Sequence, residues 1–238
     1  MGYPPRAPGG FFVVRRRMKT WVAALAAACV VGLVGCSAPY YSAMEKLGIA
    51  KRDILVDRIE AVRDSQEKAK EQVTSALDRF LDVTKADGGD LQRKYQQLNS
   101  EFERCEDRAN EVRARITAVE DVAGALFREW KQEIGQYSNA TLRRDSEREY
   151  DRTRRKYEDL IRVMRRSAER MDPVIATFRD QVLFLKHNLN ARALASLGNT
   201  HRELETDINR LIVDMEASIR DAEEFIRTMK QDIAASGG

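Results

Sequence analysis

Apolar residues recur along most of the chain at alternating spacings of three and four, as in helices that pack in coiled coils. The first stretch runs from about Met44 to Lys85. Its apolar series is Leu55, Ile59, Val62, Gln66, Ala69, Val73, Ala76, Phe80 and Val83. Asp87-Gly88-Gly89-Asp90 follows, with glycines that favour a helix end and an aspartate that favours a helix start. The pattern predicts two long helices joined by a tight antiparallel turn.

The second stretch keeps the same spacing from Leu91 to Trp130. Its members are Leu91, Tyr95, Leu98, Phe102, Cys105, Ala109, Val112, Ile116, Val119, Ala123, Leu126 and Trp130. Glu133 then interrupts the spacing before Tyr137 resumes it. At about 1.5 Å per residue, each of these two helices would be roughly 60–70 Å long.

Ser138-Asn139-Ala140-Thr141 predicts a turn and the cap of a third helix. This helix is expected to continue through Tyr150, Tyr157, Leu160, Met164 and Met171. Asp172-Pro173 is typical either of a new helix start or of a kink in a continuing helix. Residues 174–197 are the most apolar part of the mature chain, and we expect them to form the helix most enclosed by its neighbours.

Gly198-Asn199-Thr200 gives conflicting signals. Gly198 as a helix end, with Thr200 and Glu203 as a capping box, favours a new helix here. Residues 194–208 instead keep the apolar spacing through the site. We favour the break, because an unbroken helix from residue 173 to 233 would far outrun the first two. The last helix then carries Leu204, Ile208, Leu211, Met215, Ser218, Ala222, Phe225 and Met229.

These patterns predict an all-α fold, an elongated antiparallel bundle of about four long coiled-coil-like helices. We expect the bundle to occupy residues 44–234 and residues 235–238 to form a disordered tail.

A different pattern precedes the bundle. Arg15, Arg16, Arg17 and Lys19 are followed by an apolar run over residues 21–33. A basic segment and a short apolar run are typical of a secretory signal, since a membrane-spanning helix needs about 20 apolar residues. We therefore expect residues 1–35 to be a signal peptide. Residues 1–17 are unlike the start of a signal, so the alternative start is Met18.

The apolar run ends in Leu33-Val34-Gly35-Cys36, which resembles the bacterial lipobox. The resemblance implies cleavage between Gly35 and Cys36, with diacylglycerol on the Cys36 sulfur and an acyl chain such as palmitate on its amino group. Residues 36–43 would then be a lipidated tether. The alternative is a plain secretory signal with a chance cysteine.

Ser37 follows the cysteine, where many lipoproteins retained in the inner membrane have aspartate. The resemblance therefore implies an outer-membrane lipoprotein facing the periplasm, with the inner membrane as the alternative.

Removing residues 1–35 changes the charge of the chain. The full sequence has 41 basic and 38 acidic residues, a net charge of +3. Residues 1–35 contain five basic residues and no acidic one, so the mature chain carries 36 against 38 and a net charge of −2. A chain without an excess of positive charge is a poor candidate for binding nucleic acid.

Cysteine and histidine are too few for a metal or redox site. Of three cysteines, Cys29 leaves with the signal and Cys36 is the lipidation site, so Cys105 has no disulfide partner within the chain. His187 and His201 have no ligand at metal spacing. The sequence also lacks a phosphate-binding loop and a nucleophile elbow. We therefore assign no catalytic, metal or cofactor site and expect no enzymatic activity.

Two polar clusters have alternative interpretations. Lys186, His187, Asn188, Asn190 and Arg192 lie in the most apolar stretch. They are either buried polar groups that fix helix register or a ligand or partner site, in which His187 would be a pH-sensitive group.

The second cluster extends from Arg143 to Arg170, with eleven basic and seven acidic residues. Such a run is either a solvated face with ion pairs one turn apart or a surface for anionic lipid.

Several segments resemble an uncharacterised family of bacterial lipoproteins, domain-of-unknown-function family 2959. They are Lys51-Arg52-Asp53-Ile54-Leu55-Val56-Asp57-Arg58, Gly88-Gly89-Asp90-Leu91, Glu129-Trp130 and Leu185-Lys186-His187-Asn188-Leu189-Asn190-Ala191-Arg192. The resemblance covers residues 36–226. It implies an all-helical envelope lipoprotein, and it supplies no catalytic residues.

The sequence therefore favours a structural or interaction role on a membrane, with an envelope protein or a second copy of the chain as the partner. The alternative is a membrane-organising, self-assembling coiled coil that resembles phage-shock-type scaffolds.

Overall fold

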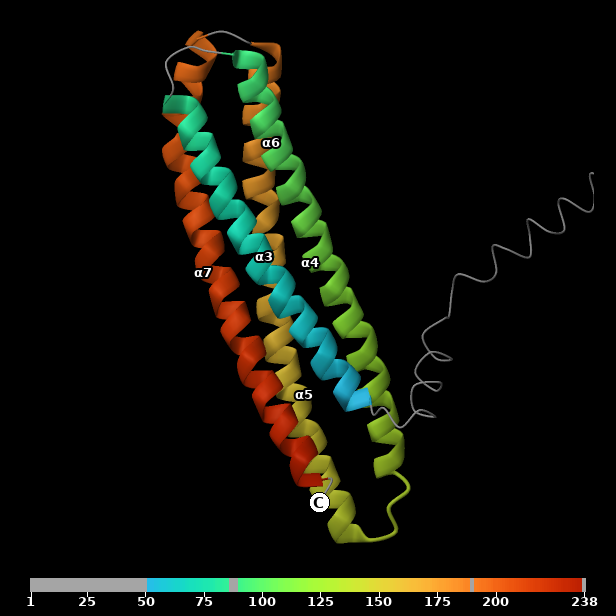
Figure 1. The fold of residues 1–238 in the computed structure, drawn as a ribbon. Helices are drawn as coiled ribbons and strands as arrows, with labels where there is room; N and C mark the ends of the chain where they lie inside the picture. Colours follow the sequence, from blue (N-terminus) through green and yellow to red (C-terminus); the bar gives the residue numbers. More distant parts are fainter. Residues whose placement is uncertain (1–50, 86–89, 189–190, 237–238) are drawn as a thin grey trace, which may run out of the picture. The chain divides into compact units, whose positions relative to one another are not determined.

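The computed structural model describes residues 51–85, 90–188 and 191–236. These residues form five helices and no strand: α3 (Lys51–Lys85), α4 (Leu91–Ile134), α5 (Ala140–Glu169), α6 (Met171–His187) and α7 (Ala191–Ser236). The helices make four arms, because α5 and α6 follow each other end to end along one side (Figure 1). The predicted all-α bundle is confirmed.

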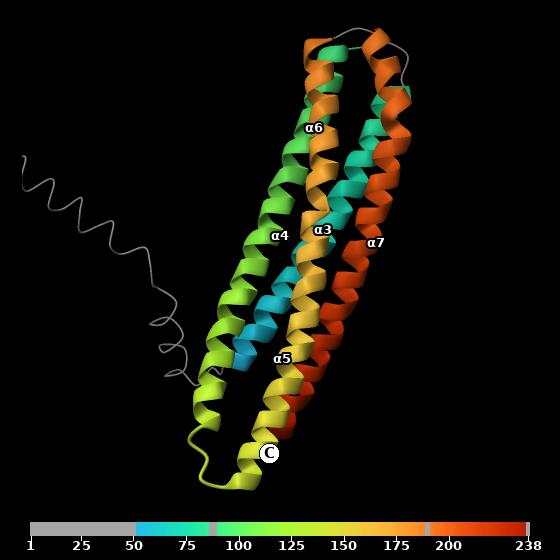
Figure 2. The same ribbon diagram turned by 180° about the vertical axis from the view of Figure 1, so that it is seen from behind.

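The four arms pack as a closed ring. α3 packs against α4 on one side and α7 on the other, and the arm made of α5 and α6 also packs against both α4 and α7. Consecutive arms run in opposite directions, as both ribbon views show (Figures 1 and 2). This up-and-down order is the one that short connections between long helices favour.

The core lies along the predicted seams. All nine members of the first apolar series, from Leu55 to Val83, are buried in α3. The eight members of the last series, from Leu204 to Met229, are buried in α7. In α4 the series is buried from Leu98 onward, except that Phe102 is half-buried. The heptad spacing thus identified the buried face of each long helix.

Side-chain caps fix the start of two helices. The backbone N–H of Arg93 donates to Asp90 Oδ1 over 3.0 Å at the start of α4. At the start of α5, the backbone N–H groups of Thr141 and Leu142 both donate to Asn139 Oδ1. Both caps were predicted, and both satisfy donors that a helix start leaves without an intrahelical acceptor.

The interruption predicted at Asp172-Pro173 lies at Arg170, between two helices of one arm. Arg170 separates α5 from α6 and keeps helical backbone angles, with φ −71° and ψ −14°. α6 begins at Met171, so Pro173 lies in its first turn, where a missing N–H removes little hydrogen bonding. Asp172 is not the cap of a new helix, because α6 already begins at Met171, so of the two predicted alternatives the structure is nearer to the continuing helix.

The prediction of a helix break at Gly198-Asn199-Thr200 was wrong. α7 runs through this site without interruption, and the chain turns about ten residues earlier. Asn188 ends α6: its backbone N–H donates to the carbonyl oxygens of Phe184 and Leu185, and its Nδ2 donates to the Phe184 carbonyl oxygen over 3.0 Å. The apolar spacing through residue 198 was therefore the stronger signal.

The expectation of one enclosed helix over residues 174–197 was also wrong. The segment is divided between α6 and the start of α7. α6 buries Val174, Phe178 and Leu185, but Leu183 is 44% and Phe184 is 42% exposed. The high apolar content of this segment therefore partly reflects side chains on the surface.

Candidate functional site

The predicted lipidation site lies outside the described residues. This applies to Gly35 and Cys36, to the tether at residues 36–43 and to the part of the first helix before Lys51. The anchor therefore stays a prediction from the sequence. No helix in the described part of the chain is both long enough and apolar enough to cross a bilayer.

The cluster around His187 lies at the end of the bundle opposite Lys51, where α6 stops and α7 begins (Figure 1). Lys186 and His187 are exposed, which contradicts the first of the two interpretations, buried groups that fix helix register. Asn188 is half-buried and caps α6. Asn190 and the side chain of Arg192 lie outside the described residues.

A buried polar pair that the sequence analysis did not single out lies in the middle of the bundle. Ser218 Oγ in α7 donates to Gln66 Oε1 in α3 over 3.0 Å, and both side chains are fully buried. No acceptor lies within hydrogen-bonding distance of Gln66 Nε2. A single polar pair in an apolar seam favours one register of two helices, because sliding the helices would leave both groups unpaired.

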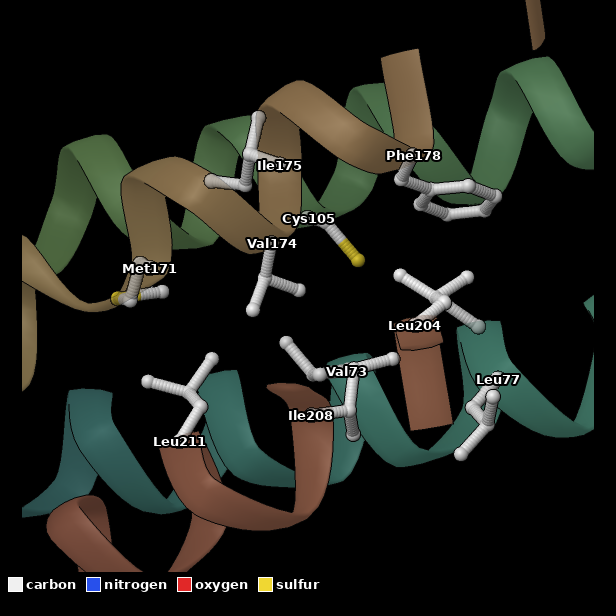
Figure 3. A pocket seen from close by; sticks show the side chains of 11 residues that line it. Val73, Leu77, Cys105, Met171, Val174, Ile175, Phe178, Leu204, Ile208 and Leu211 are labelled. Carbon is white, nitrogen blue, oxygen red and sulfur yellow. The ribbon is translucent and has the colours of Figure 1, made fainter. Parts of the chain in front are cut away.

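Cys105 is buried on the seam, as predicted. It borders a small apolar cavity together with Val73 from α3, Val174 and Phe178 from α6 and Leu204 from α7 (Figure 3). The cavity measures about 10 Å³, which is at the lower limit for one water molecule. Burial raises the pKa of the Cys105 thiol to about 12. The thiol is therefore a packing group at neutral pH, because the thiolate is the reactive form.

The basic stretch from Arg143 to Arg170 forms α5 and its end, and most of its charged side chains face solvent. Four ion pairs join residues three or four apart along this helix: Arg148–Asp145, Arg152–Glu149, Arg154–Glu158 and Arg162–Asp159. Two more link α5 and its end to other arms, Arg165 to Glu120 and Arg170 to Asp214. The structure thus has the solvated, ion-paired face of the first interpretation.

The turn between α4 and α5 exposes two large apolar side chains. Tyr137 is 39% and Leu142 is 53% exposed. The spacing had assigned Tyr137 to the seam, but α4 ends at Ile134 and the residue lies in the turn. The turn is well defined, because Arg143 Nη2 donates to the Tyr137 carbonyl oxygen over 2.6 Å and Asn139 caps α5.

The described residues offer little to a metal ion. Across residues 51–85, 90–188 and 191–236, no group of three His, Cys, Asp or Glu side chains is arranged to hold one.

Comparison with known proteins gives one match. A family model described as a protein of unknown function, DUF2959, matches residues 40–229. This range includes every helix of the bundle up to the last turns of α7. No curated protein and no solved structure matches the chain.

Proposed function

We propose a function from the residues of this chain. The chain belongs to DUF2959, and because the function of that family is unknown, membership supplies no role. The protein is a lipid-anchored component of the bacterial envelope. It is attached to the outer membrane at Cys36, faces the periplasm, and has a structural or protein-interaction role without catalysis.

The observation that carries this proposal is Leu33-Val34-Gly35-Cys36 directly after a basic segment and an apolar run. Each buried CH₂ group contributes about 0.8 kcal/mol to membrane attachment, so one acyl chain holds a protein marginally and two or more hold it stably. A triacylated Cys36 therefore needs no membrane-spanning helix.

The bundle supports a structural or interaction role. Its four arms enclose a largely apolar core. Ion pairs such as Lys230–Glu60 and Lys51–Glu129 link neighbouring arms at the surface. Such a body suits the presentation of a side or an end to a partner at a set distance from a membrane.

The test of the anchor is Cys36→Ala in the full chain. We expect this variant to accumulate as an unprocessed precursor without acyl groups, because the sulfur is the atom that receives diacylglycerol. Palmitate labelling and the mass of the purified protein measure this. Cys29→Ala, in the signal itself, is the matched control and should be processed normally. Normal processing and labelling of Cys36→Ala would contradict the proposal.

The long seam helices also favour a second candidate, a self-assembling membrane scaffold that resembles phage-shock-type proteins. Light scattering and electron microscopy of the acylated protein on vesicles separate the two, since a scaffold forms regular polymers and an interaction lipoprotein does not. Crosslinking in cells followed by mass spectrometry identifies the partner.

A further inference from the structure

Among the described residues, the hairpin of α4 and α5 projects beyond the ends of α3 and α7 at the end where α3 begins. The guanidinium of Arg52 lies 4.3 Å from the centre of the Trp130 ring, and Trp130 Nε1 donates to Ser146 Oγ over 3.1 Å. The first turn of α3 is therefore level with Trp130 and Ser146. α4 continues for four more residues to Ile134, which is about 6 Å, and the turn lies beyond that.

α7 also stops short of this turn. The ion pair between Arg170 and Asp214 sets the level of α5 against α7, and the two helices run in opposite directions. Ser236, the last residue of α7, lies as many residues after Asp214 as Arg148 lies before Arg170. The start of α5 therefore extends past the described parts of both α3 and α7, as both ribbon views show (Figures 1 and 2). We call residues 134–144 the α4–α5 tip.

The composition of the α4–α5 tip fits a membrane interface. Tyr137 and Leu142 are two of the five large apolar side chains that are exposed in the described part of the chain. From residue 136 to 144 the only charged residues are Arg143 and Arg144. Tyrosine and leucine insert at the level of lipid headgroups, and arginine next to them pairs with anionic phosphate.

The distance along the chain between Cys36 and α3 also bears on this end of the bundle. Residues 37–50 connect Cys36 to the first residue of α3. Fourteen residues span at most about 50 Å even when fully extended, which is less than the length of α4 at about 1.5 Å per residue. An acylated Cys36 therefore keeps this end of the bundle within reach of the bilayer, and the tip that projects from it is the part that meets the surface first.

We propose that the α4–α5 tip is a second membrane contact, with Tyr137 and Leu142 inserted among anionic phospholipids beside the anchor. The inference rests on the proposed lipid anchor. The contact is weak alone, because two side chains bury little area. Attachment at Cys36 makes it intramolecular and raises its effective concentration to the millimolar range. The two contacts together orient the long axis of the bundle away from the membrane surface, with the His187 end furthest from the membrane.

The test uses one reactive thiol at each end of the acylated full-length product. Cys36 is blocked by its lipid and Cys105 is buried, so an introduced cysteine is the site that a fluorophore labels. Ser138→Cys places the probe in the tip, and Lys186→Cys places a matched probe at the opposite end. Each protein is reconstituted in vesicles of phosphatidylglycerol and phosphatidylethanolamine that contain a lipid-borne quencher.

We expect strong quenching of the probe at residue 138 and little at residue 186. Adding Leu142→Asp to Ser138→Cys should abolish most of the quenching, whereas adding Val213→Asp, an exposed valine in the middle of α7, should leave it unchanged. Equal quenching at both ends, or none at residue 138 on protein that floats with the vesicles, would overturn the tip contact. Protein that fails to float would overturn the anchor itself, and flotation reports this separately.

Discussion

Gln66 shows what a repeat in the sequence can and cannot predict about a single residue. The seam spacing placed it in the core, and the structure confirms that it is fully buried. Its hydrogen bond to Ser218 joins residues 152 positions apart, so no local pattern could identify the partner. The register of α3 against α7 that this pair favours is therefore information that only the folded bundle supplies.

Leu185 tests whether α6 is held by its buried side. The side chain is fully buried, whereas Leu183, two residues earlier on the same helix, is 44% exposed. Truncating a buried leucine removes transfer free energy and leaves a cavity, so Leu185→Ala should lower the free energy of unfolding by about 2–5 kcal/mol. Urea unfolding measures this loss.

The matched control is Leu183→Ala, which should cost about 1 kcal/mol or less because much of this side chain already faces solvent. Arg165→Ala, which removes an exposed ion pair to Glu120, should also cost about 1 kcal/mol or less. A near-neutral Leu185→Ala together with lost crosslinks in cells would instead identify the end of α6 as a partner surface.

Cys105 gives a prediction about pH. Burial raises the pKa of its thiol to about 12, above the value near 9 that it has in the unfolded chain. Its contribution to stability is therefore complete below pH 9 and is lost as the pH rises toward 12, because the unfolded state loses the proton first. At pH 10 the loss should be about 1–2 kcal/mol relative to pH 7. Cys105→Ala should unfold with a shallower dependence on pH over this range, and identical slopes for the two proteins would contradict the argument.

At the scale of the helix, local signals predicted the starts better than the ends. Asp90 and Asn139 cap α4 and α5 as expected, because a cap depends on residues three positions apart at most. The helix end expected at Gly198 was wrong because contacts far from Gly198 in the sequence decide whether the helix continues. A glycine inside a helix costs about 1 kcal/mol, and burying Leu197, Leu204 and Ile208 along one face outweighs that cost.

Asn139 provides a test at this scale. Its side chain accepts hydrogen bonds from the N–H groups of two residues in the first turn of α5. Asn139→Ala should lower the free energy of unfolding by about 1 kcal/mol, since the two donors lose their acceptor. Ser138→Ala, one residue before the cap, should have a much smaller effect. Equal losses in the two melting curves would show that the cap contributes nothing specific.

At the scale of the molecule, the sequence predicted the fold class and the antiparallel order of the arms. How far each arm extends relative to the others could not be predicted. The exposure of Tyr137 and Leu142 depends on it, since it depends on where the described parts of α3 and α7 end. The spacing placed Tyr137 back in the seam after the interruption at Glu133, and nothing nearby in the sequence shows where the other arms end relative to it.

The purified chain of residues 37–238 should be soluble and strongly helical, with no β signal in far-UV circular dichroism. The reason is that the described residues from 51 onward pair their backbone groups almost entirely within helices. Sedimentation on the same sample reports whether this part of the chain associates with itself. Appreciable strand content would contradict the fold.

The position of α3 between α4 and α7 has a consequence for how the chain folds. α3 and α4 are neighbours in sequence, so their pairing needs only a short loop to close, whereas the contact of α3 with α7 closes a loop of more than a hundred residues. The apolar face that α3 turns toward α7 thus stays uncovered until the C-terminal fifth of the chain is present. A chain synthesised from its N-terminus therefore carries an exposed apolar face on the α3–α4 hairpin until α7 has been made. A truncation within α7 would leave that face exposed permanently, and we expect such a product to aggregate.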